Sequence, residues 1–372
     1  MMAGTPEERA ALAQNVVRRS LGVRRGESVI VECWTHMVPW AAACVLECRR
    51  VGAHATLQLE DEETYWASVD SAPARALGEF SPVERAALSQ ADAYIFFRGP
   101  ADMPRLRALP EKQRAALLAY NAEWYRVARR SGVRGCRVEL SGATEAQAQA
   151  FGLDAEAWQR AVLQASLQDP RELARTGRAI AQRLAKGREV VIRHENGTDL
   201  KLRLARRPPV VEAGLFTPEL RRRKVPMVSL PGGTCTVAVE ETFGEGTFVA
   251  NRPSYPFGQV YEGGRWTFRE GRLIAWEYSR GGESFETAWG RAGRGRDQVG
   301  LVSVGLNPAL VNVEMLPTLE DAPRGVVCVA IGGNRDYGGR NRSPFLRWLV
   351  LAGSEVTVDG KPLIRQGEPV LS

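Results

Sequence analysis

Histidines are the first residues to consider in this chain, because imidazole serves both catalytic metals and general acid–base steps. The 372 residues include three, His36, His54 and His194, and none lies beyond residue 194. A catalytic zinc is usually held by three protein ligands, and a non-haem iron by two histidines and one carboxylate. The chain after residue 194 offers only Asp, Glu and Cys donors. We therefore expect no metal ligands, no catalytic zinc or iron, and no cofactor there.

Carboxylates and thiols are the other groups with chemical potential. Glu240, Glu241 and Glu245 form a small acidic cluster, and paired carboxylates can perform general acid–base steps. Solvated acids at the end of a strand give the same pattern, so both interpretations stay open. The six cysteines include no Cys-x-x-Cys pair. Most of them lie in apolar patterns, which predicts buried, reduced thiols.

The charge of the chain raises the question of a nucleic-acid partner. The formal net charge is +7, with 50 Lys and Arg residues, and a basic surface is the usual footprint of nucleic-acid binding. The basic residues are dispersed, however, and the densest run is Arg221–Lys224. No zinc-finger, RNA-recognition or helix-turn-helix pattern accompanies them. We therefore expect no nucleic-acid partner.

The apolar segments and the first residues bear on localisation. No apolar stretch approaches the roughly 20 residues that a membrane span needs. Glu7 and Glu8 open an amphipathic helix rather than a secretory signal. We expect no membrane segment and a cytoplasmic protein.

Strands and helices alternate through residues 1–187, which is typical of a parallel sheet with helices on both faces. The expected strands are Ser28–Cys33, Ala53–Leu59, Ala93–Phe97 and Cys136–Leu140, and the expected helices include Glu7–Leu21, Val38–Val51, Glu111–Arg130, Asp154–Ser166 and Pro170–Ala185. We expect this α/β segment to be the first domain.

The pattern changes after Gly187. Glu189–His194 and Asp199–Leu204 flank an Asn-Gly turn, which is a hairpin signal. Further short strands, among them Val225–Leu230, alternate with Gly- and Pro-rich turns, and one helix is expected at Phe285–Arg291. Residues 188–372 are therefore expected to form a β-rich α+β domain.

Glycine-rich segments recur along the second domain in a fixed order. Leu230-Pro231-Gly232-Gly233-Thr234 precedes Ser303-Val304-Gly305-Leu306-Asn307-Pro308, and Gly325–Asn334 and Val356–Pro362 follow. This ordered set resembles the thermophilic aminopeptidase family, also called the aminopeptidase T or aminopeptidase S family, whose fold the 2,5-dihydroxypyridine dioxygenases share. In the first half, Arg25–Val31 followed by Val51–Ala53 looks like that family's first strand–helix–strand unit. The resemblance implies its two-domain fold and a homodimer.

Departures from the family's pattern fall on its metal ligands. In those peptidases a glutamate follows the Pro-Gly-Gly-like turn, a second begins the strand before the Gly-x-Asn-Pro turn, and a histidine and a His-x-Asp pair complete the site. Here the matching positions hold Thr234, a residue near Leu301, Cys328, and Phe345 with Arg347. The family's tyrosine is retained as Tyr337. The resemblance thus implies a homologue without its metal.

The replacements suggest a different ligand. Arg347 puts a positive charge where the resemblance implies an anionic metal ligand, and Arg340 and Arg342 are close in sequence. A guanidinium grips a carboxylate with two hydrogen bonds, although solvated surface arginines are the alternative interpretation. The candidate ligand-binding residues are Thr234, Glu240, Tyr255, Asn307, Cys328, Tyr337, Arg340, Arg342, Phe345 and Arg347. No residue is assigned a catalytic role.

Our leading hypothesis is a metal-free, non-catalytic protein that binds a peptide or a small anionic ligand. Peptide-binding relatives of catalytic folds occur in ribosomal-peptide natural-product pathways, and crocagin-type biosynthesis is the case that this chain looks like. The alternative is a hydrolase or a non-haem iron dioxygenase-like enzyme with a rearranged active site. Fold alone does not choose between them.

Overall fold

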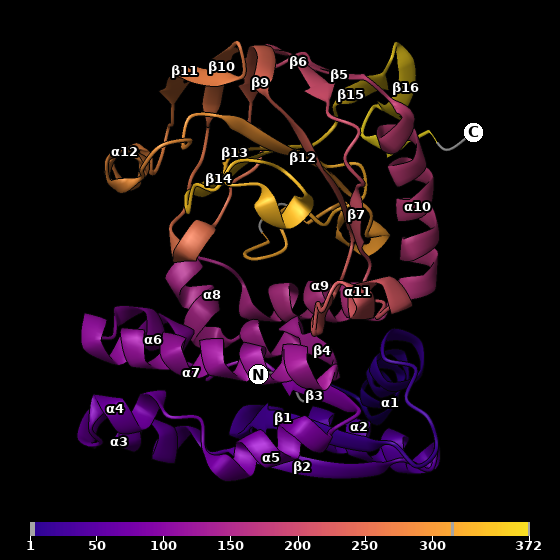
Figure 1. Cartoon of the computed structure of the whole chain (residues 1–372), viewed down its shortest axis with the longest axis vertical. Helices are drawn as coiled ribbons and strands as arrows, with labels where there is room; N and C mark the ends of the chain where they lie inside the picture. The colour runs from indigo at the N-terminus through magenta and orange to yellow at the C-terminus, as the bar shows by residue number, and fades with distance from the viewer. Residues whose placement is uncertain (1–3, 314–315, 371–372) are drawn as a thin grey trace. The chain divides into compact units, whose positions relative to one another are not determined.

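The computed structural model describes residues 4–313 and 316–370, and the chain divides into two compact units (Figure 1). Unit 1 comprises Met1–Arg171 and Gly214–Gly232, and unit 2 comprises Glu172–Ala213 and Gly233–Ser372. The expected division at residue 187 differs from this one in two ways. The helix before residue 187 belongs to unit 2, and a later segment returns to unit 1.

Unit 1 is built on a five-stranded parallel sheet in the order β2-β1-β3-β4-β8. The strands are β1 (Ser28–Trp34), β2 (His54–Glu60), β3 (Ala93–Phe97), β4 (Arg134–Val138) and β8 (Met227–Leu230). The expected α/β class is confirmed. The strand predicted at Val225–Leu230 is present as β8, but it extends this parallel sheet rather than the β-rich half.

Helices cover the sheet of unit 1, and several begin at sequence-encoded caps. Ser81 and Glu84 form a capping box at α5, as Thr5 and Glu8 do at α1, each followed by proline in the first turn. The helices are α1 (Pro6–Gln14) with a π-helical turn at Asn15–Ser20, α2 (Val38–Arg50), α3 (Glu62–Ser71), α4 (Ala74–Gly78), α5 (Pro82–Gln90), α6 (Met103–Ala108), α7 (Glu111–Ser131), α8 (Glu145–Phe151), α9 (Ala155–Ser166) and α11 (Pro218–Arg222).

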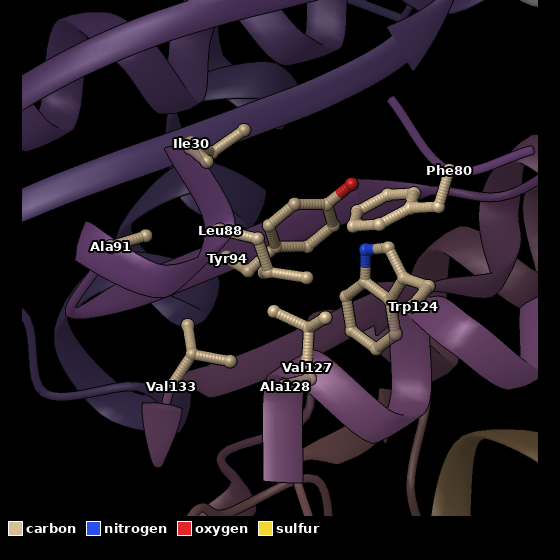
Figure 2. Close-up of a cluster of buried hydrophobic side chains, with 9 residues drawn as sticks. All are labelled: Ile30, Phe80, Leu88, Ala91, Tyr94, Trp124, Val127, Ala128 and Val133. Carbon is tan, nitrogen blue, oxygen red and sulfur yellow. The ribbon is translucent and has the colours of Figure 1, made fainter. Parts of the chain in front are cut away.

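One buried cluster shows how these helices pack on the sheet (Figure 2). Tyr94 of β3 meets Trp124 of α7 edge to face, with ring centroids 5.1 Å apart, which is a favoured aromatic geometry. The other members are Ile30, Phe80, Leu88, Ala91, Val127, Ala128 and Val133. Residues from β1, β3, α5 and α7 thus share one apolar core, which holds these elements in register.

Unit 2 contains one large, mainly antiparallel sheet whose order is β14-β13-β12-β9-β6-β5-β15-β16-β17. Its strands are β5 (Glu189–His194), β6 (Thr198–Leu204), β7 (Val210–Glu212), β9 (Thr234–Val249), β10 (Arg265–Arg269), β11 (Arg272–Glu277), β12 (Val299–Gly305), β13 (Val327–Gly332), β14 (Leu346–Leu351), β15 (Glu355–Val358), β16 (Lys361–Arg365) and β17 (Glu368–Pro369). The predicted hairpin is confirmed as β5 and β6. The predicted helix is confirmed within α12 (Gly282–Arg291).

The helix α10 (Pro170–Lys186) belongs to unit 2 from Glu172 onward. A Cβ atom added at Gly177 would lie 2.4 Å from Cγ1 of Val211, so glycine is required for this close approach. Arg183 donates a hydrogen bond of 2.7 Å to the carbonyl oxygen of Val370. Within the described residues, no helix has the length and apolar character to cross a membrane.

Candidate substrate-binding site

The candidate site lies on the four strands β9, β12, β13 and β14 of unit 2, which run side by side (Figure 1). Their register places Thr236, Ser303, Cys328 and Val350 in one row across the sheet. The hydroxyls of Thr236 and Ser303 are 2.9 Å apart and share a hydrogen bond. Because side chains alternate along a strand, this row defines one face of the sheet, which we name the Cys328 face.

The thiol of Cys328 is fully buried on this face. Burial raises its pKa well above the usual value, and the nearby carboxylates Asp321 and Glu320 raise it further. A thiol in such surroundings remains protonated at neutral pH and is a poor nucleophile. The geometry therefore favours a packing role for Cys328.

Tyr337 lies on the same face as Cys328. It belongs to a short 3-10 turn, Arg335–Tyr337, and packs with Leu346 and Trp348 against the buried residues Ala238, Leu301 and Ala330. Burial raises the pKa of its phenol, with a further contribution from Glu212. The three half-buried side chains Tyr337, Leu346 and Trp348 form what we name the apolar shelf, which lies beside β14.

Arg347 and Phe345 lie on the other face. Arg347 pairs with Ile331 in the β13–β14 register and lies three residues before Val350. Side chains alternate between the two faces of a sheet, so the side chain of Arg347 points away from the Cys328 face. The guanidinium lies 4.7 Å from the centroid of the Phe345 ring, within the range of a cation–π contact. Phe345 also meets Phe285 and Trp289 of α12 edge to face. The structure therefore separates Arg347 and Phe345 from Cys328 and Tyr337.

The outer edge of β14 carries unpaired backbone groups. The carbonyl oxygen of Val350 accepts hydrogen bonds from the backbone N–H groups of Asn251 and Arg252. The backbone hydrogen-bonding groups of Val350 therefore point away from β13. In an antiparallel ladder, every second residue of the edge strand points its backbone N–H and C=O outward. On β14 the residues that do so after Val350 are Trp348 and Leu346. The Leu346 carbonyl accepts a hydrogen bond of 2.8 Å from Nη1 of Arg347. In the described part of the chain, the N–H and C=O of Trp348 have no partner on this edge.

The other predicted arginines and the acidic cluster are held differently. Glu241 is buried and accepts two hydrogen bonds from the guanidinium of Arg207, at 2.8 and 2.7 Å. It also accepts from Nδ2 of Asn334 and from the backbone N–H of Arg340. Burial opposes ionisation, but these bonds outweigh it and lower the pKa of Glu241 to about 2. Glu241 is therefore a structural anchor that is charged at neutral pH.

Glu240, Arg340 and Arg342 do not share this anchor through their side chains. The side chains of Arg340 and Arg342 are exposed. Glu240 is half-buried and lies 3.6 Å from the guanidinium of Arg203. The loop that contains Arg340 is therefore held to Glu241 by the backbone N–H of Arg340. The guanidinium groups of Arg340 and Arg342 lie in solvent.

Asn307 and Thr234 are positioned by the Gly-Gly turn. Asn307 is fully buried, and its Oδ1 accepts a hydrogen bond of 3.1 Å from the N–H of Ala309. A Cβ atom added at Gly233 would lie 2.9 Å from Cβ of Asn307, which explains the glycine. Thr234 begins β9 and pairs with Glu212 and Gly305. Asn307 thus has the turn role that its type favours.

A group of acids near these residues was missed by the sequence analysis. Burial raises the pKa of Asp321 to about 7, and the neighbouring Glu320 and Glu212 raise it as well. The N–H of Tyr255, which is buried, donates a hydrogen bond of 3.2 Å to Oε1 of Glu320. The adjacent pair Glu320-Asp321 was the only signal in the sequence, because Glu212 is distant along the chain.

Comparison with known proteins decides the family. The family model of the thermophilic metalloproteases, M29, matches residues 6–312. The chain belongs to the M29 family. The predicted resemblance to the aminopeptidase fold is thereby confirmed. No curated protein matches the chain.

Two solved structures share the fold of this M29 chain. Wild-type AmpT from Thermus thermophilus has a TM-score of 0.72 at 21% identity, covering 98% of this chain and 99% of that one. The 2,5-dihydroxypyridine dioxygenase from Pseudomonas putida KT2440 has a TM-score of 0.61 at 16% identity, covering 99% of this chain and 98% of that one. At these identities the likeness shows the fold.

The donors of this M29 chain do not fit the metal that the family's description implies. Among residues 4–313 and 316–370, no three His, Cys, Asp or Glu side chains gather so that they could hold a metal ion. His36 and His54 belong to unit 1. His194 lies at the end of β5, and its Nδ1 accepts a hydrogen bond of 3.0 Å from the N–H of Asn196. We therefore assign no metal-dependent step to these residues.

Proposed function

We propose that this M29 protein binds an extended peptide without hydrolysing it, and that the peptide adds as a further strand to the edge of β14. The observation that carries the proposal is that the N–H and C=O of Trp348 on that edge have no partner among the residues that the structure describes. Strand addition uses such groups for affinity, and side-chain pockets beside the edge for specificity.

The two faces beside β14 offer different pockets. On the Cys328 face, the apolar shelf of Tyr337, Leu346 and Trp348 is half-buried and can cover apolar side chains of a peptide. On the other face, Arg347 lies against Phe345 with its guanidinium next to the edge, since it already reaches the Leu346 carbonyl. Because a strand presents alternate residues to opposite faces, the preferred peptide alternates apolar and acidic residues.

Arg347 supports this proposal in a second way. Its bond to the Leu346 carbonyl occupies an acceptor that an incoming strand needs. An acidic residue of the peptide would draw the guanidinium away and expose that carbonyl, because a carboxylate can accept two parallel hydrogen bonds from a guanidinium, whereas the carbonyl accepts one here. The arginine thus both selects the peptide and frees the edge for it.

The biological setting that we propose is the handling of a ribosomally made precursor peptide during natural-product biosynthesis. A metallopeptidase fold already accommodates a peptide chain, and a protein that lacks its metal donors can retain the peptide without cleaving it. The donor arrangement described above supports this division between binding and chemistry.

The test uses a fluorescein-labelled heptapeptide in which valine and glutamate alternate, with fluorescence polarization as the readout. We expect saturable binding, much weaker binding of an isomer with the valines and glutamates in two blocks, and weaker binding of the valine–lysine version. Equal affinity for all three peptides would contradict strand addition at β14, since the faces would then select nothing.

A second function is favoured by one observation, the raised pKa of Asp321, which suits a general acid or base near neutral pH. The same peptide is therefore incubated with the protein and analysed by mass spectrometry. Intact peptide supports the binding role. Cleavage that disappears in Asp321→Asn would replace that role by hydrolysis.

A further inference from the structure

Three glutamates gather on one face of the parallel sheet of unit 1. Glu32 lies in β1, Glu60 is the last residue of the neighbouring strand β2, and Glu84 lies in the first turn of α5. Glu32 follows Ile30 by two residues, so its side chain lies on the face that α5 and α7 cover (Figure 2). We name these three residues the Glu32 cluster.

The carboxyls of the Glu32 cluster lack a cation. Among residues 4–313 and 316–370, none of the three forms an ion pair, and Arg85, which follows Glu84, pairs with Glu123 instead. Burial raises the pKa of Glu32 to about 8, and the charges of Glu84 and Glu60 contribute. Carboxyls that burial and like charges perturb in this way are concentrated at functional sites.

Two of the three carboxyls have oxygens that no hydrogen bond occupies. Glu84 is held from two sides, because Oε1 accepts from the hydroxyl of Tyr120 and Oε2 accepts a bond of 3.1 Å from the N–H of Ser81. The carboxyls of Glu32 and Glu60 accept no hydrogen bond from the part of the chain that the structure describes. Both are half-buried, so solvent reaches them.

Trp34 adds an unused hydrogen-bond donor to the Glu32 cluster. It lies two residues beyond Glu32 and pairs with Glu60 in the β1–β2 register, so all three side chains share a face. Only 7% of Trp34 is exposed, and its Nε1 has no hydrogen-bond partner in the described residues. The ring meets Tyr65 edge to face, with centroids 4.8 Å apart. Because a buried indole N–H usually has a partner, this one indicates a ligand oxygen.

The Glu32 cluster lies where open α/β sheets usually bind ligands. Glu32 and Trp34 are in the second half of β1, and Glu60 ends β2. The chain passes from β1 to β2 on one side of β1 and then to β3 on its other side, which makes β1 a topological switch point. Ligands of such sheets bind beside the carboxyl ends of the strands at that point.

The side chains around the cluster favour an organic cation. Burial raises the pKa of the Tyr120 phenol, and the charges of Glu84, Glu32 and Glu60 raise it further, so this ring lies among the three acids. Phe96 pairs with Glu32 in the β1–β3 register. Carboxylates bind guanidinium and ammonium groups through charge-assisted hydrogen bonds, and aromatic rings attract such cations.

We propose that unit 1 binds a small organic cation at the Glu32 cluster. Its guanidinium or ammonium group lies between Glu32 and Glu60, and a neighbouring oxygen of the ligand accepts a hydrogen bond from Nε1 of Trp34. Derivatives of basic amino acids carry both groups. This site belongs to unit 1 and is independent of the peptide edge of β14 in unit 2.

The test titrates the full chain with L-argininamide in a calorimeter. This probe carries a guanidinium and a carbonyl oxygen. L-citrullinamide has nearly the same shape but an uncharged group in place of the guanidinium, and it should bind at least about tenfold more weakly. Equal affinities of the two probes, or no binding of L-argininamide by the wild type, would overturn the proposal.

A charge-removing variant locates the site. Glu32→Gln keeps the shape of the side chain and should weaken L-argininamide at least about tenfold. Thermal unfolding should show this variant to be no less stable than the wild type, because it removes a charge that Glu60 and Glu84 repel. The control Glu145→Gln removes an exposed charge in the first turn of α8 and should bind normally. Normal binding by Glu32→Gln, or an equal loss in both variants, excludes the Glu32 cluster.

The role of Trp34 is tested with a probe that lacks the acceptor. Agmatine carries the guanidinium and an amine but no carbonyl oxygen. Trp34→Phe keeps an aromatic ring and removes Nε1, so it should weaken L-argininamide severalfold and leave agmatine unchanged. A loss for both probes would assign Trp34 to packing alone and would overturn its place in the proposed site.

Discussion

Arg347 and Trp348 are consecutive residues of β14 and point to opposite faces of the same sheet. Trp348 packs with Tyr337 against the Cys328 face, while Arg347 lies against Phe345 on the other. Between them runs the backbone edge of β14, on which the N–H and C=O of Trp348 have no partner within residues 4–313 and 316–370. This arrangement pairs a cationic pocket with an apolar one, in the alternation that an added strand requires.

Reversing the charge of Arg347 should exchange the peptide preference. Arg347→Ala should weaken binding of the valine–glutamate heptapeptide by about fivefold, corresponding to about 1 kcal/mol for a partly exposed ion pair. Arg347→Glu should prefer the valine–lysine peptide. Polarization titrations measure both. Arg342→Ala removes an exposed guanidinium nearby and should have no effect; an equal loss there would point to general electrostatic attraction.

The ion pair of Arg207 and Glu241 should be a major contributor to the stability of unit 2. Arg207→Ala leaves a buried carboxylate without its cation, which typically costs about 3–5 kcal/mol. The free energy of unfolding, measured in urea, should fall by that order. The matched control is Arg203→Ala, which breaks the more exposed contact with Glu240 and should cost less than about 1 kcal/mol. Similar losses for both variants would contradict the anchor role.

The depressed pKa of Glu241 sets an acid limit on stability. A carboxyl that is ionised more readily in the folded protein stabilises it fully above its unfolded pKa, for which the ordinary value is 4.5. This contribution is lost as the pH falls from there through the folded value of about 2. The stability of Glu241→Gln should therefore change less than that of the wild type between these two pH values. Urea unfolding across that range checks it, and parallel profiles would disagree.

The raised pKa of Asp321 acts in the opposite direction. Its folded value of about 7 lies above the ordinary value of 3.8, so the unfolded chain releases this proton first as the pH rises. The contribution of Asp321 to stability is present below pH 3.8 and is lost by about pH 7. Asp321→Asn should therefore gain stability relative to the wild type as the pH rises through this window. A difference that does not depend on pH would show that Asp321 ionises normally.

Two helical glycines provide a matched pair for packing. Gly177→Ala in α10 places a methyl group 2.4 Å from Cγ1 of Val211, and overpacking of this kind typically costs about 1–3 kcal/mol. Gly290 in α12 has no atom within 4 Å of an added Cβ, so Gly290→Ala should stabilise by about 0.4–1 kcal/mol. Thermal unfolding measures both variants. If Gly177→Ala left the thermal stability unchanged, α10 would have to lie further from Val211 than the structure shows.

The sequence predicted the fold class and the family well, because local patterns carry that information. The alternation of strands and helices before residue 187, and the Asn-Gly turn between β5 and β6, correspond to observed elements. The position of β8 was not predictable. Its four residues, Met227–Leu230, look like any short apolar strand, and their pairing with β4 is set by tertiary packing.

The candidate site was predicted only in part. Tyr337 and Cys328, both candidate residues, lie on one face of the sheet. Arg347 and Phe345 lie on the other face, and this placement depends on the register of β13 and β14. The importance of Trp348 follows from the edge position of β14, which is set by the order in which the strands pair. Likewise, Glu212 acts on Asp321 because tertiary packing brings them together, although they are far apart in the sequence.

The most direct measurement is a backbone scan of the bound peptide. Seven versions of the valine–glutamate heptapeptide, each with one backbone nitrogen methylated, are titrated against the wild-type protein by fluorescence polarization. Strand addition at β14 predicts alternation, because only every second N–H of an edge-bound peptide points at the protein. Methylation at one set of alternate residues in the centre should abolish binding and at the other set should leave it intact. Uniform affinities, or losses without alternation, would contradict strand addition.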